Sequence, residues 1–453
     1  MLKQLPLGGL LILGLGLAMS VRAEGLVEVY RLAELNDASL RAAAQARMAT
    51  REAYPQARAQ LLPNIGLSAG VNRDWLDYPD NGARDDFDYT SQNYTLNLSQ
   101  PLYDRARFIA RDQAERVVSQ AELDYADSKQ NLLLRASEAY FAVLRARAEL
   151  RLAEADLAAN DSRLAQTEKR FEVGLIAITD LADARSARDQ ALARRISAEA
   201  GLADAHEALR VLTAKELADL DDVRGDLGPV RPDPADPQSW VAFAEEQNIA
   251  LQSTRVGLDI ARHEIEIQRS GHYPTVSLNA SYGYQDTQLA GQPLENYDTR
   301  VGVQLNMPLY AGGAVVSRSR EATYRFQQAQ DNYEAARRDT VRATRDAFRA
   351  VTSKIGEIDA FEQGVKSAET QLAANEAGYE VGTRTIVDVI TAQSLLTQAR
   401  RNLFNARYDY LLSTLRLKRA AGTLAFTDLE ALQQELVPAS DSSAASGAPS
   451  ARP

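Results

Sequence analysis

The chain has 453 residues, a formal net charge of −11 at pH 7 and no cysteine. The lack of cysteine excludes disulfides, thiolate metal sites, cysteine nucleophiles and the lipid-bearing cysteine of an outer-membrane lipoprotein. The acidic charge argues against nucleic acid as a partner, because nucleic-acid phosphates attract basic surfaces. Alanine, leucine, arginine, glutamate and glutamine dominate the sequence, as is typical of long helices.

Residues 1–23 have the pattern of a signal peptide. Lys3 supplies the positive start, 7–19 form an apolar core, and Val21-Arg22-Ala23 gives the small-x-small cleavage pattern. The apolar core is shorter than the ~20 residues that a transmembrane helix needs. We therefore expect a secreted chain that is cleaved before Glu24.

The remaining chain is one unit written twice, because three local patterns recur after about 210 residues. We expect a first structural repeat at 24–230 and a second at 231–436, with a linker rich in proline, glycine and aspartate at 225–237. The tail 437–453 is rich in Ser, Ala, Pro and Gly, which predicts disorder. The recurring patterns are Leu62–Leu67 with Tyr273–Leu278, Leu98–Tyr103 with Leu305–Tyr310, and Phe171–Leu181 with Tyr379–Val389.

Each half contains two segments in which apolar and small polar residues alternate, as in strands with one apolar face. A soluble sheet packed on a helix and a membrane β-barrel both fit this alternation. Strands of ~10 residues with aromatic residues at their ends favour the barrel. Four strands cannot close a barrel, so the barrel would have to be shared within an oligomer. The aromatic residues are Trp75, Tyr78, Phe87, Tyr89, Tyr103, Tyr297 and Tyr310.

Two further segments in each half have a clear character. The stretches 74–88 and 285–298 are polar and mostly acidic, and we expect them to be solvated loops that connect the paired strands. The stretches 104–172 and 314–380 contain no proline and little glycine. They predict helices roughly 100 Å long, which is typical of coiled coils rather than globular cores.

In this order and spacing, the motifs resemble those of the TolC family of outer-membrane efflux and type I secretion channels. The resemblance covers about 24–436. The motifs that carry it are Arg170–Asp180, Tyr379–Thr383 with Asp388–Thr391, Gly271–Thr275 and Pro308–Gly313.

The resemblance implies a mixed α/β membrane protein in the outer membrane, in contact with its lipid and with most of its mass in the periplasm. Three chains would share a 12-stranded antiparallel β-barrel, four strands per chain, continued by a long α-helical coiled-coil tunnel. The implied function is a passive exit duct, gated at its periplasmic tip, for a tripartite efflux pump or a type I secretion system. The implied partners are a periplasmic adaptor and an inner-membrane ABC or RND-type pump.

Two other classes of protein remain as alternatives. A coiled-coil stalk or adhesin without transport activity would need one anchor rather than two duplicated hairpins. A periplasmic adaptor would have one helical hairpin flanked by β-rich domains. The sequence therefore favours the channel over both.

The break between the long helices in each half defines two tips. Gly174 and Gly382 suit the left-handed residue that ends a helix. Thr179, Asp180 and Asp388 suit N-caps, and this structural role accounts for much of the pattern. In a trimer, each tip aspartate would also become a ring of three carboxylates that attracts cations.

The resemblance implies roles for further tip residues. The family's second tip carries two aspartates three residues apart and a basic residue after the tip tyrosine Tyr379. Here Thr385 takes the first aspartate position and Glu380 the basic one, so either Glu380 adds charge to the mouth or Arg384 supplies a substitute tie. The adaptor would dock at four tip residues, which are Gly174, Leu175, Gly382 and Thr383.

No motif indicates catalysis. His206, His263 and His272 lack metal-ligand spacing, and no nucleophile elbow, phosphate-binding loop or HExxH is present. We expect neither an enzyme nor a cofactor or metal.

Overall fold

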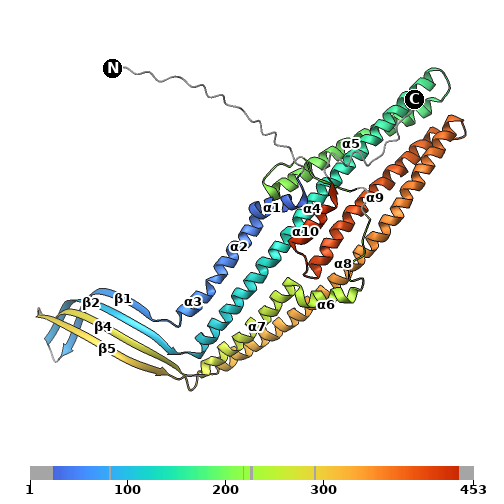
Figure 1. Cartoon of the computed structure of the whole chain (residues 1–453). Coiled ribbons are helices and arrows are strands. Elements are labelled where there is room, and N and C mark those ends of the chain that lie inside the picture. Colours follow the sequence, from blue (N-terminus) through green and yellow to red (C-terminus); the bar gives the residue numbers. More distant parts are fainter. Residues whose placement is uncertain (1–23, 81–82, 218, 225–227, 290–291, 438–453) are drawn as a thin grey trace, which may run out of the picture.

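The computed structural model describes residues 24–80, 83–217, 219–224, 228–289 and 292–437. The molecule is elongated, with a four-stranded sheet at one end and the tips of two long helical hairpins at the other (Figure 1). The expected signal peptide, 1–23, lies outside the described residues, as does the tail from 438 onward. Val437, the first residue of the expected tail, instead pairs with Asp222 in a short two-stranded sheet.

The large sheet confirms the prediction of four strands. Its order is β1-β2-β4-β5, and each neighbouring pair is antiparallel. Among the described strands, β1 and β5 each pair on one side only, so each leaves one edge open. The strands are β1 Asn64–Asp80, β2 Ala83–Tyr103, β4 Thr275–Leu289 and β5 Gln292–Asn306.

The prediction of acidic loops at 74–88 and 285–298 is wrong, because most of each stretch is strand. Asp74 pairs with Tyr89 and Asp286 with Glu295, so the ladders continue close to the hairpin ends. Backbone hydrogen bonds hold such ladders together, and acidic side chains that stay in water do not oppose them. The side chains of 76–89, which include three of the expected girdle aromatics, lie outside the described part of the structure.

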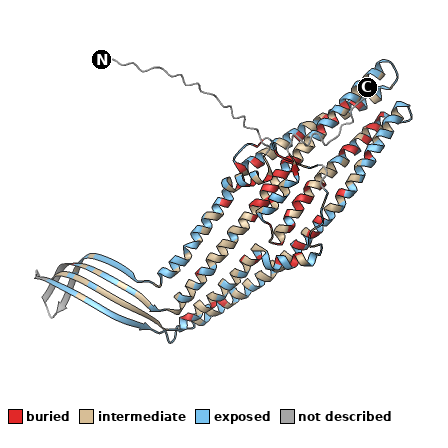
Figure 2. Ribbon diagram, viewed as in Figure 1, coloured by how far each residue is buried: buried red, intermediate tan, exposed pale blue. Residues whose placement is uncertain are grey.

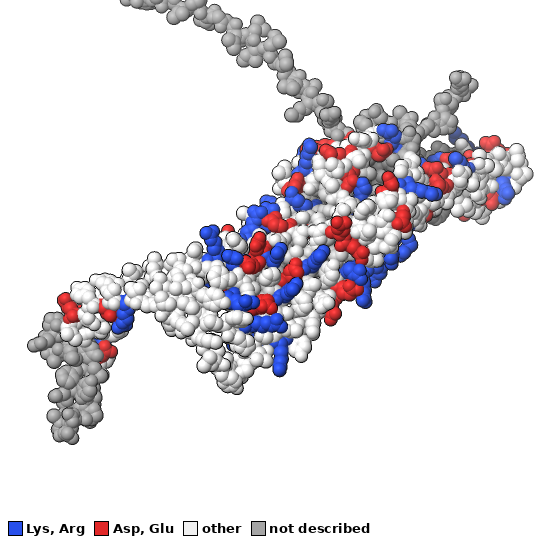
Figure 3. Space-filling view, turned by 60° about the horizontal axis from the view of Figure 1, so that its bottom comes forward, with Lys and Arg blue, Asp and Glu red and all other residues white. Residues whose placement is uncertain are grey.

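One section of the sheet has the dimensions of a membrane span. This section, called here the apolar belt, comprises 64–69, 94–103, 275–284 and 297–306. Its β4 and β5 segments have the length of a tilted transmembrane strand, about 9–11 residues. One face of the belt carries exposed apolar side chains, such as Leu67 at 75% exposure. A part of the sheet without charged side chains lies between the charged helical body and the charged far end (Figure 3).

A row of tyrosines marks the outer limit of the apolar belt. Tyr94, Tyr284 and Tyr297 are register partners on three adjacent strands, with ring centroids 6.2 and 5.0 Å apart. The next row on the same face contains Asp286 and Glu295. The change from tyrosine to carboxylate within one step matches the interfacial girdle of a membrane barrel.

The long helices form as predicted. Helix α4, Arg105–Glu172, is followed by α5, Ile178–Thr213, and helix α8, Ala314–Glu380, is followed by α9, Ile386–Ala420. Asp104 caps α4 by accepting a hydrogen bond from the Arg107 backbone. Buried small residues recur every seven positions along α5, a spacing typical of a coiled coil in which the helices approach closely. These residues are Ala184, Ala191 and Ala198.

Shorter helices complete the layer that continues the sheet. Helix α2 lies against α4, and α7 lies between α4 and α8 (Figure 1). No helix within the described residues has a stretch long and apolar enough to cross a bilayer. The remaining elements are α1 Leu26–Asn36, α2 Ala38–Arg51, α3 Ala53–Ala59, β3 Asp222–Val223, α6 Pro237–Gln247, α7 Ile249–Arg269, η1 Ser270–His272, α10 Phe426–Gln434 and β6 Leu436–Val437.

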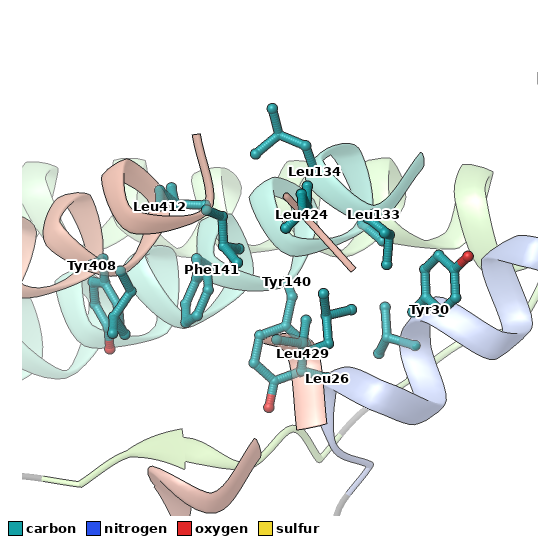
Figure 4. Close-up of a cluster of buried hydrophobic side chains, with 14 of the residues drawn as sticks. Leu26, Tyr30, Leu133, Leu134, Tyr140, Phe141, Tyr408, Leu412, Leu424 and Leu429 are labelled. Atoms are coloured by element: carbon teal, nitrogen blue, oxygen red, sulfur yellow. The ribbon is translucent and has the colours of Figure 1, made fainter. Parts of the chain in front are cut away.

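Burial is concentrated in the middle of the molecule, where α1 packs against α4 and α10 and buried residues of α9 join the same cluster (Figures 2 and 4). Tyr140 and Tyr408 are buried there, and each hydroxyl has a partner. Tyr140 donates to the Asp221 carbonyl at 2.6 Å, and Tyr408 donates to the Asp222 carboxylate at 3.2 Å. Burial raises the pKa of both tyrosines, so both hydroxyls stay protonated. This core fixes the bases of both hairpins and leaves their tips to project from it.

Candidate functional site

The first tip ends α4 with a left-handed glycine, as predicted. Gly174 has φ +75°. Its N–H donates to the Phe171 carbonyl at 2.9 Å, and the N–H of Leu175 donates to the Arg170 carbonyl at 2.9 Å. These two bonds define a Schellman motif, which satisfies carbonyls at the end of a helix.

The second tip ends α8 in the same way. Gly382 has φ +79°. Its N–H donates to the Tyr379 carbonyl at 3.2 Å, while the N–H of Thr383 donates to the Gly378 carbonyl at 2.8 Å. An added Cβ at Gly382 would meet no atom within 4 Å. Glycine is therefore required for its backbone conformation rather than for space.

The start of α9 carries a complete capping box. The Thr385 hydroxyl accepts from the Asp388 N–H at 3.3 Å, and the Asp388 carboxylate accepts from the Thr385 N–H and hydroxyl, each at 2.9 Å. The predicted N-cap at Asp388 is therefore wrong, because Thr385 is the cap and Asp388 is the third helical residue. The bonds from Thr385, with a smaller contribution from Arg384, lower the pKa of Asp388.

The start of α5 lacks such a cap. The N-cap residue is Ala177, whose side chain makes no capping bond. Thr179 and Asp180 are the second and third helical residues, so their predicted N-cap roles are wrong. The Asp180 N–H donates to the Ala177 carbonyl at 3.2 Å. The Asp180 carboxylate lies in the first turn, where the helix dipole favours negative charge.

Both tips expose apolar side chains. Leu175 is 73% exposed, and Val173, Ile178 and Val381 are exposed to similar degrees. In contrast, Leu181 of α5 and Ile386 of α9 are buried inside their hairpins. Each tip therefore has a small exposed apolar surface.

Side chains of α4 tie the first hairpin to α8 of the second hairpin near the tips. Arg163 forms an ion pair with Glu376 at 3.4 Å, and the Arg170 guanidinium lies 5.0 Å from the centroid of the Tyr379 ring. Burial lowers the pKa of Arg163, although Glu376 acts against this shift. The Tyr379 hydroxyl is buried and makes no hydrogen bond to the described residues. Glu380, at the end of α8, is exposed.

A buried carboxylate joins three helices farther from the tips. Asp156 is 4% exposed. It accepts from Arg194 of α5 at 2.8 Å and from Thr397 of α9 at 3.4 Å. The sequence analysis missed this residue and the arginine ties. A signal was present, because the buried face of α4 carries polar residues at helical spacing, namely Asp156, Asn160 and Thr167.

The chain matches the Outer membrane efflux protein family over residues 29–215 and 240–423. It belongs to this family. It is 40% identical to outer membrane protein TolC of Vibrio cholerae over 95% of this chain and 97% of that protein. It is 37% identical to outer membrane protein TolC of Escherichia coli over 93% and 87%. The alkaline protease secretion protein AprF of Pseudomonas aeruginosa is 33% identical over 92% and 88%.

Solved structures share the fold of this outer membrane efflux protein. VceC of Vibrio cholerae matches with a TM-score of 0.76 at 20% identity, over 88% of this chain and 96% of that chain. CusC matches with a TM-score of 0.75 at 21% identity, over 88% and 92%. The resemblance to the TolC family is thus confirmed, as is an outer-membrane channel with a strand region and a helical tunnel. Family and fold favour this channel over a stalk or an adaptor.

The described residues hold no group of three or more histidine, cysteine, aspartate or glutamate side chains that could bind a metal ion. His206 is half-buried, and desolvation together with the charge of Arg147 lowers its pKa. His263 contacts the Asp259 carbonyl of its own helix at 2.8 Å. The candidate site consists of the helix ends, the charged residues and the α4–α8 contacts at the two tips.

Proposed function

We propose that three copies of this chain form the passive exit duct of a tripartite efflux pump or a type I secretion system. The open edges of β1 and β5 are the single observation that carries this proposal. An open edge cannot face lipid, because its backbone groups would have no hydrogen-bond partners. Pairing β5 of one copy with β1 of the next satisfies both edges, and three copies close a 12-stranded antiparallel barrel.

Lipid contact follows from the same closure. The apolar face of the belt carries exposed Leu67, Val301 and Val303, which are costly to leave in water. Facing these side chains outward places them against the outer-membrane lipid and turns the polar face of the belt toward the lumen. The helices then continue the barrel as a periplasmic tunnel.

The tips form the entrance of the duct. Three copies bring three Asp388 and three Asp180 carboxylates around one axis, where they attract cations. The lowered pKa of Asp388 keeps its carboxylate charged at neutral pH. Asp180 and Asp388, with Thr179 and Thr385 at the same helix starts and Tyr379 and Glu380 at the end of α8, are the proposed entrance residues.

Arginine ties on α4 hold the entrance closed. The Arg163–Glu376 pair and the contact of Arg170 with Tyr379 fix the second hairpin against the first. Loss of these contacts frees α8 and α9 to move outward. Arg384, the candidate for a substitute tie, acts on Asp388 within its own tip, and the contacts proposed to hold the hairpins together come from α4.

A periplasmic adaptor docks on the tips and links the duct to an inner-membrane ABC or RND-type pump. The exposed Leu175 and its apolar neighbours support this role, since apolar side chains that become buried on binding stabilise protein interfaces. Gly174, Gly382 and Thr383 shape the turns that present them. The names of relatives fit both kinds of traffic, because AprF is a protease secretion protein and CzcC of Cupriavidus metallidurans a cobalt-zinc-cadmium resistance protein.

Planar-bilayer recordings of Asp388→Ala test the entrance. The reversal potential in a salt gradient should move toward that of an unselective pore, because one ring of charge is lost. An unchanged reversal potential would contradict the charged entrance. Docking is tested separately with Gly174→Glu, which should abolish export while leaving the trimer intact; loss of the trimer would instead indicate misfolding.

A further inference from the structure

The apolar belt contains only two charged residues, Asp298 and Arg300, both on β5. They form an ion pair with an N–O distance of 2.8 Å. The rest of the belt consists of apolar, small and uncharged polar residues. Charged residues that face the lumen of a membrane barrel tune its selectivity, so the orientation of this pair matters.

Both charges lie on the polar face of the belt. Side chains alternate along β5, so Asp298 and Arg300 share a face with Gly302 and Gln304, while Val301 and Val303 lie on the apolar face. Register partners agree with this assignment, because Arg300 pairs with Ser281 and Asp298 with Gly283. In the closed barrel of the proposed function, both charges therefore face the lumen.

The pair leaves Arg300 open to the lumen. The Arg300 side chain is 79% exposed, and that of Asp298 is 40% exposed. The neighbouring Gly302 has no atom within 4 Å of where its Cβ would lie. β5 is also the edge that joins β1 of the next copy, and β1 presents Gly66 and Gly70 on the same polar face. Gly302 on the same strand and Ser281 on β4 are small neighbours that leave room for the guanidinium.

We propose that Arg300 and Asp298 form a second selectivity element, a ring of three ion pairs inside the barrel. This inference rests on the trimeric barrel of the proposed function but is independent of the entrance. Arg300 attracts anionic groups of the passing cargo, such as carboxylates, and Asp298 limits this attraction by neutralising the guanidinium. The duct thus has rings of carboxylates at its entrance and a ring of Arg300–Asp298 ion pairs inside the barrel.

Reversal potentials of paired variants test the ring. The recordings use full-length protein with Asp388→Asn in all samples, which removes one charge ring from the entrance. The dilute side of the KCl gradient is kept at ~0.01 M, where charges act over about 30 Å. Arg300→Gln should raise the potassium-to-chloride permeability ratio on the order of severalfold, and Asp298→Asn should lower it similarly. Arg210→Gln, an exposed arginine paired with Glu207 on α5, is the matched control and should change nothing.

Three results would overturn the ring. One is an unchanged permeability ratio in both variants with intact trimers. Another is a shift of the same sign in both variants. The third is loss of the trimer in Arg300→Gln with rescue by Arg300→Lys, which would mean that the charge only protects the strand edge from wrong pairing. A wild-type chain that forms no trimer would refute the proposed function instead, so the two failures are distinguishable.

Discussion

The two hairpin tips end their first helices alike and begin their second helices differently. Both α4 and α8 stop in a Schellman motif with glycine at φ +75° or +79°. α9 then begins with a capping box of Thr385 and Asp388, whereas α5 begins at Ala177 with no side-chain cap. The acidic residues of the two tips are therefore not equivalent.

The aspartates of the two tips therefore have different structural roles at the entrance. Asp388 stabilises the start of its own helix, so its charge and its position are both fixed. Asp180 makes no capping bond at its helix start, and its carboxylate is available for contacts across the entrance. The second tip thus has a side-chain cap at its helix start, whereas the Asp180 carboxylate of the first tip has no such role.

The largest effect is expected where the two tips are tied together. Arg163→Ala removes the ion pair with Glu376, which contributes roughly 1 kcal/mol in each chain. Over three chains, ~3 kcal/mol corresponds to on the order of a hundredfold in the closed-to-open ratio. Single-channel conductance should rise in the variant. Arg188→Ala, which breaks a surface pair with Asp161 inside the first hairpin, is the control and should leave conductance unchanged; an equal rise in both variants would contradict the tie.

The shared helix ends predict equal effects at both tips. Gly174→Ala and Gly382→Ala each place a Cβ on a left-handed residue, at about 1–2 kcal/mol. Amide hydrogen exchange at the ends of α4 and α8 should accelerate to a similar degree. A much smaller effect at one tip would show that the two turns are not equivalent.

The unequal helix starts predict opposite effects of exchanging the caps. Thr385→Ala should destabilise the first turn of α9 by about 1 kcal/mol, and Ala177→Thr should stabilise the first turn of α5 by a similar or smaller amount. Amide exchange in the two first turns measures both changes. No gain in Ala177→Thr would mean that the backbone at Ala177 cannot place a capping oxygen.

The smallest effect is expected from pH. The pKa of Asp388 is lowered in the folded chain, so its capping contribution is present above the unfolded pKa of about 3.9 and is lost as pH falls through the lower folded value. Exchange at the start of α9, corrected for the intrinsic pH effect, should stay constant from pH 7 to about pH 4 and then accelerate. In Thr385→Ala the folded pKa of Asp388 should rise toward its unfolded value, so the acceleration below about pH 4 should be smaller.

The sequence predicts the fold well where one periodic pattern of apolar residues continues without interruption. The long proline-free stretch 104–172 becomes a helix at Arg105–Glu172, because nothing in it stops the helix before Gly174. The strands are predicted in place but too short. Their acidic ends looked like loops, although backbone pairing does not depend on side-chain charge once the strands leave the membrane.

The site is predicted less completely. Gly174 and Gly382 are correct because only glycine adopts that backbone conformation readily. The caps were misplaced because Ala177 carries no capping signal, and Thr385 took the role given to Asp388. Arg163 was missed because its partner lies 213 residues away along the chain, and such contacts depend on how the two hairpins pack.

The conductance of the purified wild-type protein, recorded after its mass has been measured, tests the central claim most directly. A trimer closed at its tips should give a small, cation-selective conductance that grows when Arg163 is replaced by alanine and becomes less selective for cations when Asp388 is replaced. A monomer, or a trimer that conducts no current even with both aspartates and Arg163 replaced, would contradict the account and favour a scaffold without a channel.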